Sequence, residues 1–333
     1  MPEIAQILRR MKDVRVAFVG DMCLDMYWEA DMRLSLLSKE TPHHPLPIIS
    51  ERYSPGGGAN VAANLAALGV GSLHACTILG DDWRTMLLLE ALKPLGMQQD
   101  GIIRTNNWLT AAYCKPIRCG ISDVKYEDPR IDFENRVPPP QDAESRLLAK
   151  VNGLRGRVDA IAVTEQFAYS CITQKIRDAL CELARQIPVV VDSREGAHIY
   201  RHAIVKPNEY EAAHLFGANI DEAFSASSLL AAAQHISACS GASSIITLGE
   251  RGAFCYDGET GHHILAHACE PPIDIVGAGD TFLAAVTASL GAGSSLADAV
   301  SIGNAAAAVT VKKCGTTGTA SPEELLAVLQ RRQ

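Results

Sequence analysis

From residue 158 onward, short apolar segments alternate regularly with longer segments of helical composition. We predict strands at 160–164, 189–192, 203–206, 244–248 and 252–256, and helices at 172–187, 209–216 and 226–239. This alternation favours a parallel sheet, because parallel strands need crossover helices that then cover both faces of the sheet. Ligands of such sheets bind beyond the carboxyl ends of the strands. We therefore predict an α/β fold with a doubly wound, mostly parallel sheet and a ligand site at those ends.

The first 140 residues add two further kinds of segment. Strands are predicted at 14–19 and 72–79, and helices at 59–69 and 84–95. Two segments differ from this pattern: about 22–54 is rich in proline toward its end, and 101–137 alternates apolar and polar residues with few helix formers. We predict that both form a small β-sheet, a lid, inserted into a single domain spanning 1–333.

Composition and charge exclude several classes of protein. The net charge of −8 is unsuited to a broad nucleic-acid interface. The ten cysteines have neither a C-x-x-C pair nor zinc spacing, which is typical of reduced thiols in a cytoplasmic protein. The uncharged runs at 281–297 and 300–311 are rich in small residues, so we expect buried helices and no membrane segment.

A glycine-rich turn at 274–282 precedes an alanine-rich helical segment. Gly277 and Gly279 flank Ala278, and Asp280 follows. Such a turn can present the free N–H groups of a helix start to an anion, whose charge the helix dipole favours. Asp280 is then either a base that takes a proton from a hydroxyl group or a residue that caps the helix. The turn alone leaves both interpretations open.

Five short motifs occur in order along the chain. They are GDMCLD (20–25), PGGGANVA (55–62), KPNEYE (206–211), TLGERG (247–252) and DIVGAGDTF (274–282). Together they resemble the motifs of the ribokinase-like (phosphofructokinase B type) carbohydrate kinase family over nearly the whole chain. Within it, segments 20–28, 55–69, 80–82 and 130–134 are most similar to heptose-7-phosphate kinases of lipopolysaccharide-precursor synthesis. The nucleotidyltransferase domain often fused to that kinase is not expected here.

The resemblance implies transfer of the γ-phosphate of ATP to a hydroxyl group of a sugar or sugar phosphate. Asp280 would be the base, with an anion hole formed by Gly277, Ala278 and Gly279. The implied sugar ligands are Asp21, Asp25, Gly56, Gly57 and Asn60. From the residues alone, Asn60 could instead cap a helix and Asp25 could be a solvated turn residue.

The resemblance also implies a nucleotide and two cations. The implied ATP-binding residues are Lys206, Asn208, Glu211, Thr247, Gly249, Gly252 and Asn304. Glu211 would hold Mg²⁺ through water, because Mg²⁺ keeps several waters and takes few protein ligands. K⁺ would be held by Asp274, Val276 and Gly315. Asn208 and Glu211 could equally be ordinary helix caps, and Lys206 a charge at a strand end.

Two segments depart from the family pattern, at 38–47 and 164–167, and both would border the sugar. A kinase of this family for another sugar, sugar phosphate or nucleoside therefore stays open, as does a non-catalytic nucleotide or sugar sensor. Lys115, Arg118 and Arg130 could meet a phosphate or could protect the edges of the small sheet. We expect a homodimer formed through the lid, a small-molecule substrate, and no nucleic-acid or membrane partner.

Overall fold

The computed structural model describes residues 2–315 and 317–330 and contains a large sheet of nine strands. In spatial order the strands are β14 (Gly261–Ile264), β13 (Ala253–Tyr256), β12 (Ser244–Thr247), β11 (Ile204–Val205), β10 (Val189–Ser193), β9 (Ala160–Glu165), β1 (Arg15–Gly20), β4 (Ser72–Gly80) and β5 (Gln98–Thr105). The seven strands from β12 to β5 in this spatial order are parallel, and β13 and β14 add an antiparallel edge. The predicted doubly wound, mostly parallel sheet is confirmed.

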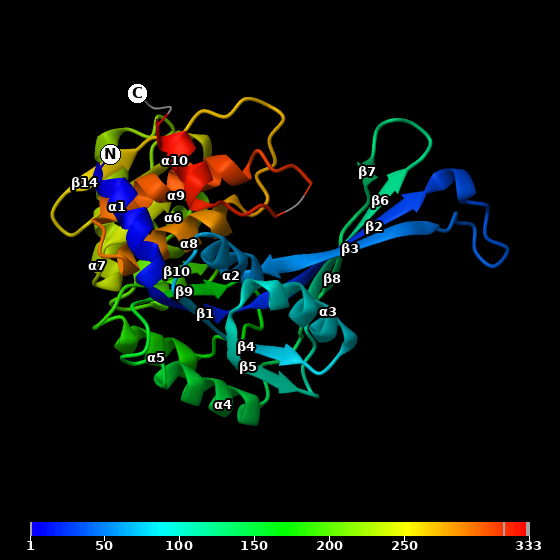
Figure 1. Ribbon diagram of the computed structural model, residues 1–333, viewed down its shortest axis with the longest axis horizontal. Helices are drawn as coiled ribbons and strands as arrows, with labels where there is room; N and C mark the ends of the chain where they lie inside the picture. The colour runs from blue at the N-terminus through cyan, green and yellow to red at the C-terminus, as the bar shows by residue number, and fades with distance from the viewer. Residues whose placement is uncertain (1, 316, 331–333) are drawn as a thin grey trace.

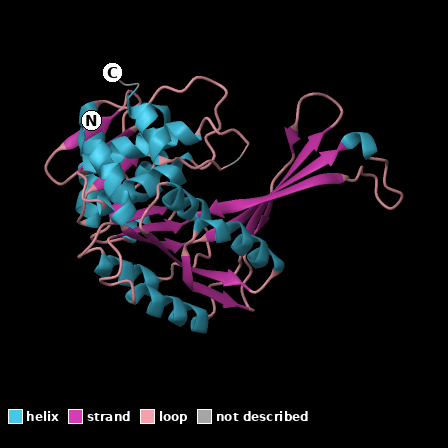
Figure 2. Ribbon diagram, viewed as in Figure 1, coloured by secondary structure: helices cyan, strands magenta, loops and turns pink. Residues whose placement is uncertain are grey.

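Helices cover both faces of this sheet (Figure 2). Their apolar residues divide into two core clusters. The first cluster takes residues of α1 (Pro2–Arg10), α2 (Gly58–Ala67), α3 (Trp83–Leu92), α8 (Ala278–Gly291), α9 (Leu296–Thr310) and α10 (Pro322–Gln330). The second takes residues of α4 (Gln141–Asn152), α5 (Gln174–Leu183), α6 (Glu209–Phe216) and α7 (Ala226–Ser240). The residues of β1 are continuously apolar because both faces of the strand are buried. Val16 and Phe18 pack in the first cluster, and Ala17 and Val19 pack in the second.

A second, smaller sheet projects from the body of the molecule (Figure 1). It consists of β3 (Ile48–Gly57), β2 (Met22–Asp31), β6 (Ala111–Cys119) and β7 (Tyr126–Glu127), with β8 (Ile131–Phe133) also paired to β6. Strand β2 follows β1 almost directly, and β3 leads straight into α2. The chain therefore leaves the large sheet at 20–22 and returns to it at 57–58.

The predicted lid segment 101–137 begins too early. Residues 101–105 belong to β5, which pairs in parallel with β4 in the large sheet. Their alternation has a simple cause, because β5 is the edge strand of that sheet and buries only one of its faces well. The small sheet takes the later residues of the predicted segment and those of 22–57.

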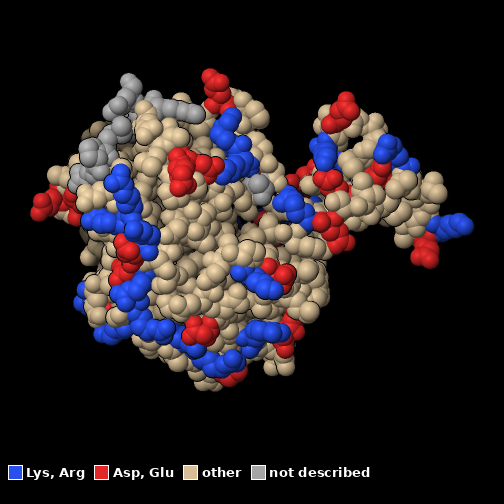
Figure 3. Space-filling model, viewed as in Figure 1, with Lys and Arg blue, Asp and Glu red and all other residues tan. Residues whose placement is uncertain are grey.

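The charged residues and the cysteines are distributed over the structure as follows. Lys and Arg are interspersed with Asp and Glu on the face that Figure 3 shows, and charges of both signs gather at the neck between the body and the small sheet. All ten cysteines are free thiols. Within the described part of the chain, none of the helices has the length and apolar character needed to cross a membrane.

Candidate active site

The amino terminus of α8 lies at the carboxyl edge of the large sheet and carries the predicted anion hole. Gly277 has a left-handed backbone (φ 81°), and α8 begins at the next residue, Ala278. A Cβ atom on Gly277 would lie 2.7 Å from Asn60 Nδ2, so only glycine fits here. The Ala278 N–H donates to the Ile275 carbonyl oxygen at 3.2 Å, which closes the turn in front of the helix. The remaining N–H groups of the first turn have no acceptor within their own helix.

Asp280 and Asn60 contact each other across this helix start. Asn60 Nδ2 donates to Asp280 Oδ2 at 2.9 Å, and Asn64 Nδ2 donates to the Asn60 carbonyl oxygen at 3.0 Å. Helix α2 begins at Gly58, so Asn60 is the third helical residue and does not cap the helix. Gly277, in turn, stands at the capping position of α8. The structure therefore places Asp280 and Asn60 inside their helices, where their side chains are available to each other and to a ligand.

The environment of Asp280 makes its carboxyl group a much weaker acid than an exposed aspartate. Loss of solvation raises the pKa of Asp280 from 3.8 to about 7, the Asn60 hydrogen bond opposes this rise, and the charge of Asp192 adds to it. Asp192 stands near the end of β10, and Lys206 Nζ lies 3.0 Å from Asp192 Oδ2. We assigned Asp192 no role from the sequence, although its position at the end of a predicted strand was a signal.

Asp25 lies at the base of the small sheet beside a partly buried lysine, Lys115. Only 4% of Asp25 is exposed, and Lys115 Nζ lies 3.4 Å from its Oδ2. Burial raises the pKa of Asp25, while the Lys115 charge lowers it. A Cβ atom on Gly56 would lie 2.5 Å from Asp25 Oδ1, which explains the glycine of the motif. Asp25 is thus a buried carboxylate and not a solvated turn residue.

Asp21 differs from its predicted role as a sugar ligand. Its carboxylate accepts four hydrogen bonds from one loop, the 166–171 loop: from the backbone N–H groups of Gln166, Phe167 and Cys171 and from the Ser170 hydroxyl, at 2.9–3.3 Å. A carboxylate has about four acceptor positions, so this loop takes them all. Asp21 therefore holds the loop in place, and a sugar would meet the loop instead of Asp21 itself.

A partly buried carboxylate, that of Glu165, anchors the start of this loop. It accepts hydrogen bonds from Arg177 Nη2 at 2.6 Å and from the hydroxyl groups of Ser193 and Tyr200, each at 3.0 Å. The next residue, Gln166, has its Oε1 atom 3.2 Å from the place a Cβ atom on Gly57 would occupy. The segment that departs from the family pattern is therefore held by side-chain hydrogen bonds beside the glycines of the 55–58 motif, and sequence reasoning missed Arg177 and Tyr200 as its supports.

The predicted nucleotide residues occupy neighbouring ends of β11 and β12. Asn208 caps α6, and its backbone N–H donates to Glu211 Oε2 at 2.9 Å, so the two form a capping box. Burial raises the pKa of Glu211, and the charge of Asp192 adds to the rise. Asn208 also pairs through its backbone with Thr247 in an isolated parallel β-bridge. Gly249 and Gly252, which follow β12, both have positive φ angles.

Asn304 is predicted to lie near the nucleotide, on α9. In the structure Asn304 Nδ2 donates to the Ile264 carbonyl oxygen at 2.8 Å. Asn304 thus ties α9 to the end of β14, and its contact with a nucleotide stays a prediction.

The predicted K⁺ ligands also come together. The Asp274 carboxylate accepts the N–H groups of Val276 and Gly315, each at 3.0 Å. The Gly315 carbonyl oxygen accepts Arg52 Nη2 at 2.7 Å.

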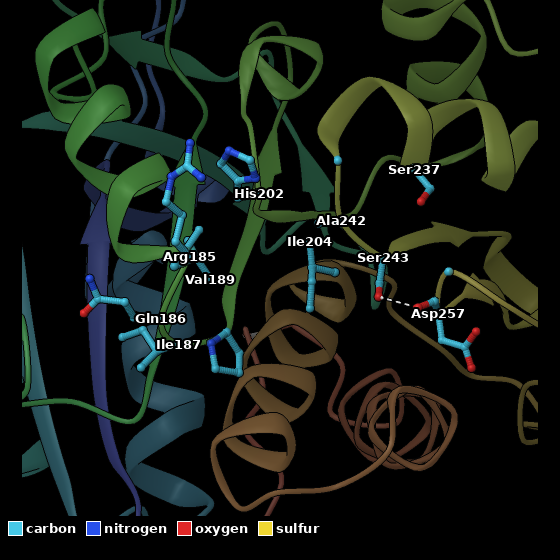
Figure 4. Close-up of a pocket in the computed structure, with 14 residues that line it drawn as sticks. Arg185, Gln186, Ile187, Val189, His202, Ile204, Ser237, Ala242, Ser243 and Asp257 are labelled. Carbon is cyan, nitrogen blue, oxygen red and sulfur yellow. Dashed lines mark hydrogen bonds between the residues drawn. The ribbon is translucent and has the colours of Figure 1, made fainter.

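A separate cavity lies at the opposite edge of the sheet. It has a volume of about 620 Å³ and is lined by the amino-terminal ends of β10 and β11 and by the end of α7, including Arg185, His202 and Ser243 (Figure 4). The Ser243 hydroxyl donates to the Asp257 carbonyl oxygen at 3.3 Å. None of the predicted site residues lines this cavity, so it is distinct from the cluster around Asp280.

Comparisons with known proteins fit this arrangement. The profile of the pfkB family carbohydrate kinases matches residues 167–324. Bifunctional protein HldE of Gluconobacter oxydans is 32% identical over 320 residues, covering 93% of this chain and 63% of the relative. HldE of Citrifermentans bemidjiense is 30% identical over 331 residues, covering 98% and 65%. The chain is thus similar to pfkB family carbohydrate kinases over residues 167–324 and to the HldE proteins over nearly its whole length. It spans less than two thirds of the length of these two relatives.

Solved structures of a phosphofructokinase and a ribokinase share the fold. Phosphofructokinase-2 from Escherichia coli in complex with fructose-6-phosphate superposes with a TM-score of 0.72 at 20% identity, covering 96% of this chain and 99% of that one. Arabidopsis thaliana ribokinase complexed with ribose and ATP gives 0.69 at 20% identity, covering 95% and 99%. The ribokinase-like fold is thereby confirmed, and the match of residues 167–324 to the pfkB family carbohydrate kinases supports the predicted class of enzyme.

Proposed function

We propose that this chain is a kinase of the pfkB family that transfers the γ-phosphate of ATP to a hydroxyl group of a sugar phosphate, with heptose 7-phosphate as the first candidate. The contact between Asn60 and Asp280 at the start of α8 carries this proposal. It puts a carboxylate with a pKa of about 7 beside unpaired helix N–H groups. A base of that strength can take a hydroxyl proton near neutral pH while the helix start stabilises the charge on the transferred group.

Each residue of the site has a separate proposed role in the reaction. Asp280 takes the proton from the acceptor hydroxyl group, and Asn60 orients its carboxylate. The turn at Gly277, Ala278 and Gly279 presents N–H groups to the moving phosphoryl group. Asp25 and Gln166 flank the glycines of the 55–58 motif and are suited to hydrogen bonds with sugar hydroxyl groups.

The acidic residues near the nucleotide side fit a Mg²⁺ ion held mainly by phosphate and water. Glu211 and Asp192 lie close enough that the charge of Asp192 raises the pKa of Glu211, and a divalent cation would relieve this repulsion. Within 2–315 and 317–330, no group of three His, Cys, Asp or Glu side chains surrounds a metal position. Mg²⁺ with few protein ligands suits this sparse set, and it would neutralise phosphate charge when bound.

Two basic residues near Asp25 are the candidates to contact the phosphate of a phosphorylated sugar. The Arg130 guanidinium lies 3.8 Å from the centre of the Tyr113 ring, and Lys115 Nζ lies 3.2 Å from the Tyr27 hydroxyl oxygen. Both cations act on Asp25 and lower its pKa against the effect of burial. Arg130 is also bonded to Asp132, with Nε 2.6 Å from Oδ1 and Nη2 2.7 Å from Oδ2, so a substrate phosphate would compete with Asp132 for this guanidinium. Arg118 likewise pairs with Asp128 at 2.8 Å.

The small sheet also suits a homodimer. Its strands and loops carry many exposed apolar side chains, namely Leu34, Leu36, Leu37, Ile48, Ile49, Ile121, Val124, Tyr126 and Ile131. A projecting sheet with this much exposed apolar surface is typical of an interaction site, and a second copy of the same sheet would cover it.

A sugar panel tests the proposed reaction. ADP release would be followed with heptose 7-phosphate, fructose phosphates, ribose and nucleosides, using the protein, the variant Asp280→Asn and, as a matched control, Asp123→Asn in an exposed loop. We expect the wild type and Asp123→Asn to turn over a sugar phosphate. Asp280→Asn should lose this turnover but still bind ATP. Binding of ATP without turnover on any acceptor would indicate a sensor and refute the proposal, and normal turnover of Asp280→Asn would refute the assignment of the base.

A further inference from the structure

Two backbone segments, 270–276 and 311–315, lie against each other beside the anion-hole turn. The Asp274 N–H donates to the Val311 carbonyl oxygen at 2.8 Å, and the Asp274 carboxylate accepts the N–H groups of Val276 and Gly315. Asp274, Val276 and Gly315 are the residues that the family resemblance would give to K⁺. Their geometry can therefore be tested against what a cation needs, which is several oxygen atoms free to face it.

Cationic side chains of the chain itself already occupy oxygen atoms of both segments. Arg52 Nη2 donates to the Gly315 carbonyl oxygen at 2.7 Å. Lys312 Nζ donates to the carbonyl oxygens of Glu270 and Pro272 at 2.5 and 3.1 Å. Each oxygen of the Asp274 carboxylate accepts a backbone N–H group. The residues present therefore do not fit a K⁺ ion well.

Arg52 is held in this position from its other side. It stands on β3 of the small sheet, and its guanidinium lies 3.8 Å from the centre of the Tyr27 ring on the adjacent strand β2. A guanidinium keeps its charge at every physiological pH. A second cation on the Gly315 carbonyl oxygen would be repelled by this charge at short distance.

We propose that Arg52 supplies the positive charge at the 274–315 contact, so that the chain needs no monovalent cation there. This inference rests on the proposed kinase function where activity is the measurement. It also assigns Arg52 as a positioning residue, because Asp274 and Val276 precede the turn that Gly277 completes. The charge comes from the small sheet, and the anion-hole turn is thereby linked to the position of that sheet.

The test varies the cation and the side chain. Turnover would be measured in KCl and in tetramethylammonium chloride at equal ionic strength. The variants are Arg52→Gln, which removes the charge but keeps an N–H donor, Arg52→Lys, which keeps the charge, and the control Arg33→Ala, in the short 3₁₀ helix that follows β2. We expect less than a twofold difference between salts for the wild type, the control and Arg52→Lys. Arg52→Gln should lose at least tenfold in tetramethylammonium and regain most of this in KCl.

A second measurement does not depend on turnover. Thermal unfolding in the two salts, without sugar or nucleotide, should give equal midpoints for the wild type and a higher midpoint in KCl for Arg52→Gln. A wild type that K⁺ activates or stabilises saturably would overturn the inference, as would an Arg52→Gln variant that behaves like Arg33→Ala in both measurements. If no acceptor is turned over, the proposed function fails, and the unfolding midpoints still decide on Arg52.

Discussion

The hydrogen bond between Asn60 and Asp280 makes a specific prediction about the pH dependence of the reaction. The bond favours the ionised carboxylate, because Asn60 Nδ2 donates to it at 2.9 Å and lowers the pKa of Asp280. Asn60→Ala removes this donor, so the pKa of Asp280 should rise. A general base must be ionised to act, and the acid limb of kcat/KM should therefore move to higher pH.

The size of the shift follows from the type of bond. A hydrogen bond to a charged group contributes about 1.5–3 kcal/mol, which at about 1.4 kcal/mol per pKa unit is about 1–2 units. Asp280 is partly exposed, and water replaces some of the lost bond, so we expect about 1 unit. Starting from a pKa of about 7, the ionised fraction at pH 6 falls from about one tenth to about one hundredth, whereas at pH 9 both proteins are largely ionised.

The assay is the full pH profile of kcat/KM for Asn60→Ala, with the exposed Asn152→Ala as the matched control. The ratio of wild-type to variant rates should be about tenfold larger at pH 6 than at pH 9, and the control should show no such change. A variant that loses the same factor at every pH would refute the reasoning. Asn60 would then act on the sugar alone and not on the base.

Three further outcomes are expected. Asp280→Asn should unfold like the wild type near pH 4 and be more stable above pH 7, because the raised pKa of Asp280 means that wild-type stability is lost as pH rises from 3.8 to about 7. The gain is about 4 kcal/mol in a dry site and about half that for a partly solvated carboxyl, and unfolding midpoints at the two pH values measure it. Arg130→Ala should raise KM about tenfold for a phosphorylated sugar and little for a free sugar, with Arg33→Ala as the control, and equal effects on both sugars would contradict a phosphate contact. Asp21→Asn replaces one carboxylate oxygen with an NH2 group, which cannot accept a hydrogen bond from the N–H donors of the 166–171 loop. Denaturant unfolding should therefore show a loss of about 1–3 kcal/mol, and an unchanged midpoint would show that the loop is held by other contacts.

The large sheet was predictable because its signals are local. A buried parallel strand is apolar on both faces, as Val16 to Val19 show, and the helix between two strands has its own period and caps. The position of the site was predictable for the same reason, since strand ends mark one edge of the sheet. The alternation at 101–105 misled because an edge strand of the large sheet and a strand of a small sheet have the same pattern.

The individual roles were less accessible because they depend on contacts between distant segments. The carboxylate of Asp21 is filled by backbone N–H groups of the 166–171 loop, and backbone donors leave no trace in residue types. Asn60 faces Asp280 only because α2 starts two residues earlier and packs against α8. Arg52 reaches Gly315 across the space between the small sheet and a loop near the end of the chain. None of these distances is fixed by local sequence.

The pairing of β2 with β6 bears on how the molecule assembles. These two strands are parallel neighbours, with Cys23 opposite Ala111, yet β3, α2, β4, α3 and β5 all lie between them in the chain. Closing so long a loop is entropically costly, so we expect β2 and β6 to pair only after β1, β4 and β5 have paired with one another. If unfolding follows the reverse order, the small sheet is the first part to open. Amide hydrogens of β2 and β6 should then exchange through local openings, whereas those of β1 should exchange only through global unfolding. The surface proposed to choose the sugar and the partner would then be the least cooperative part of the chain.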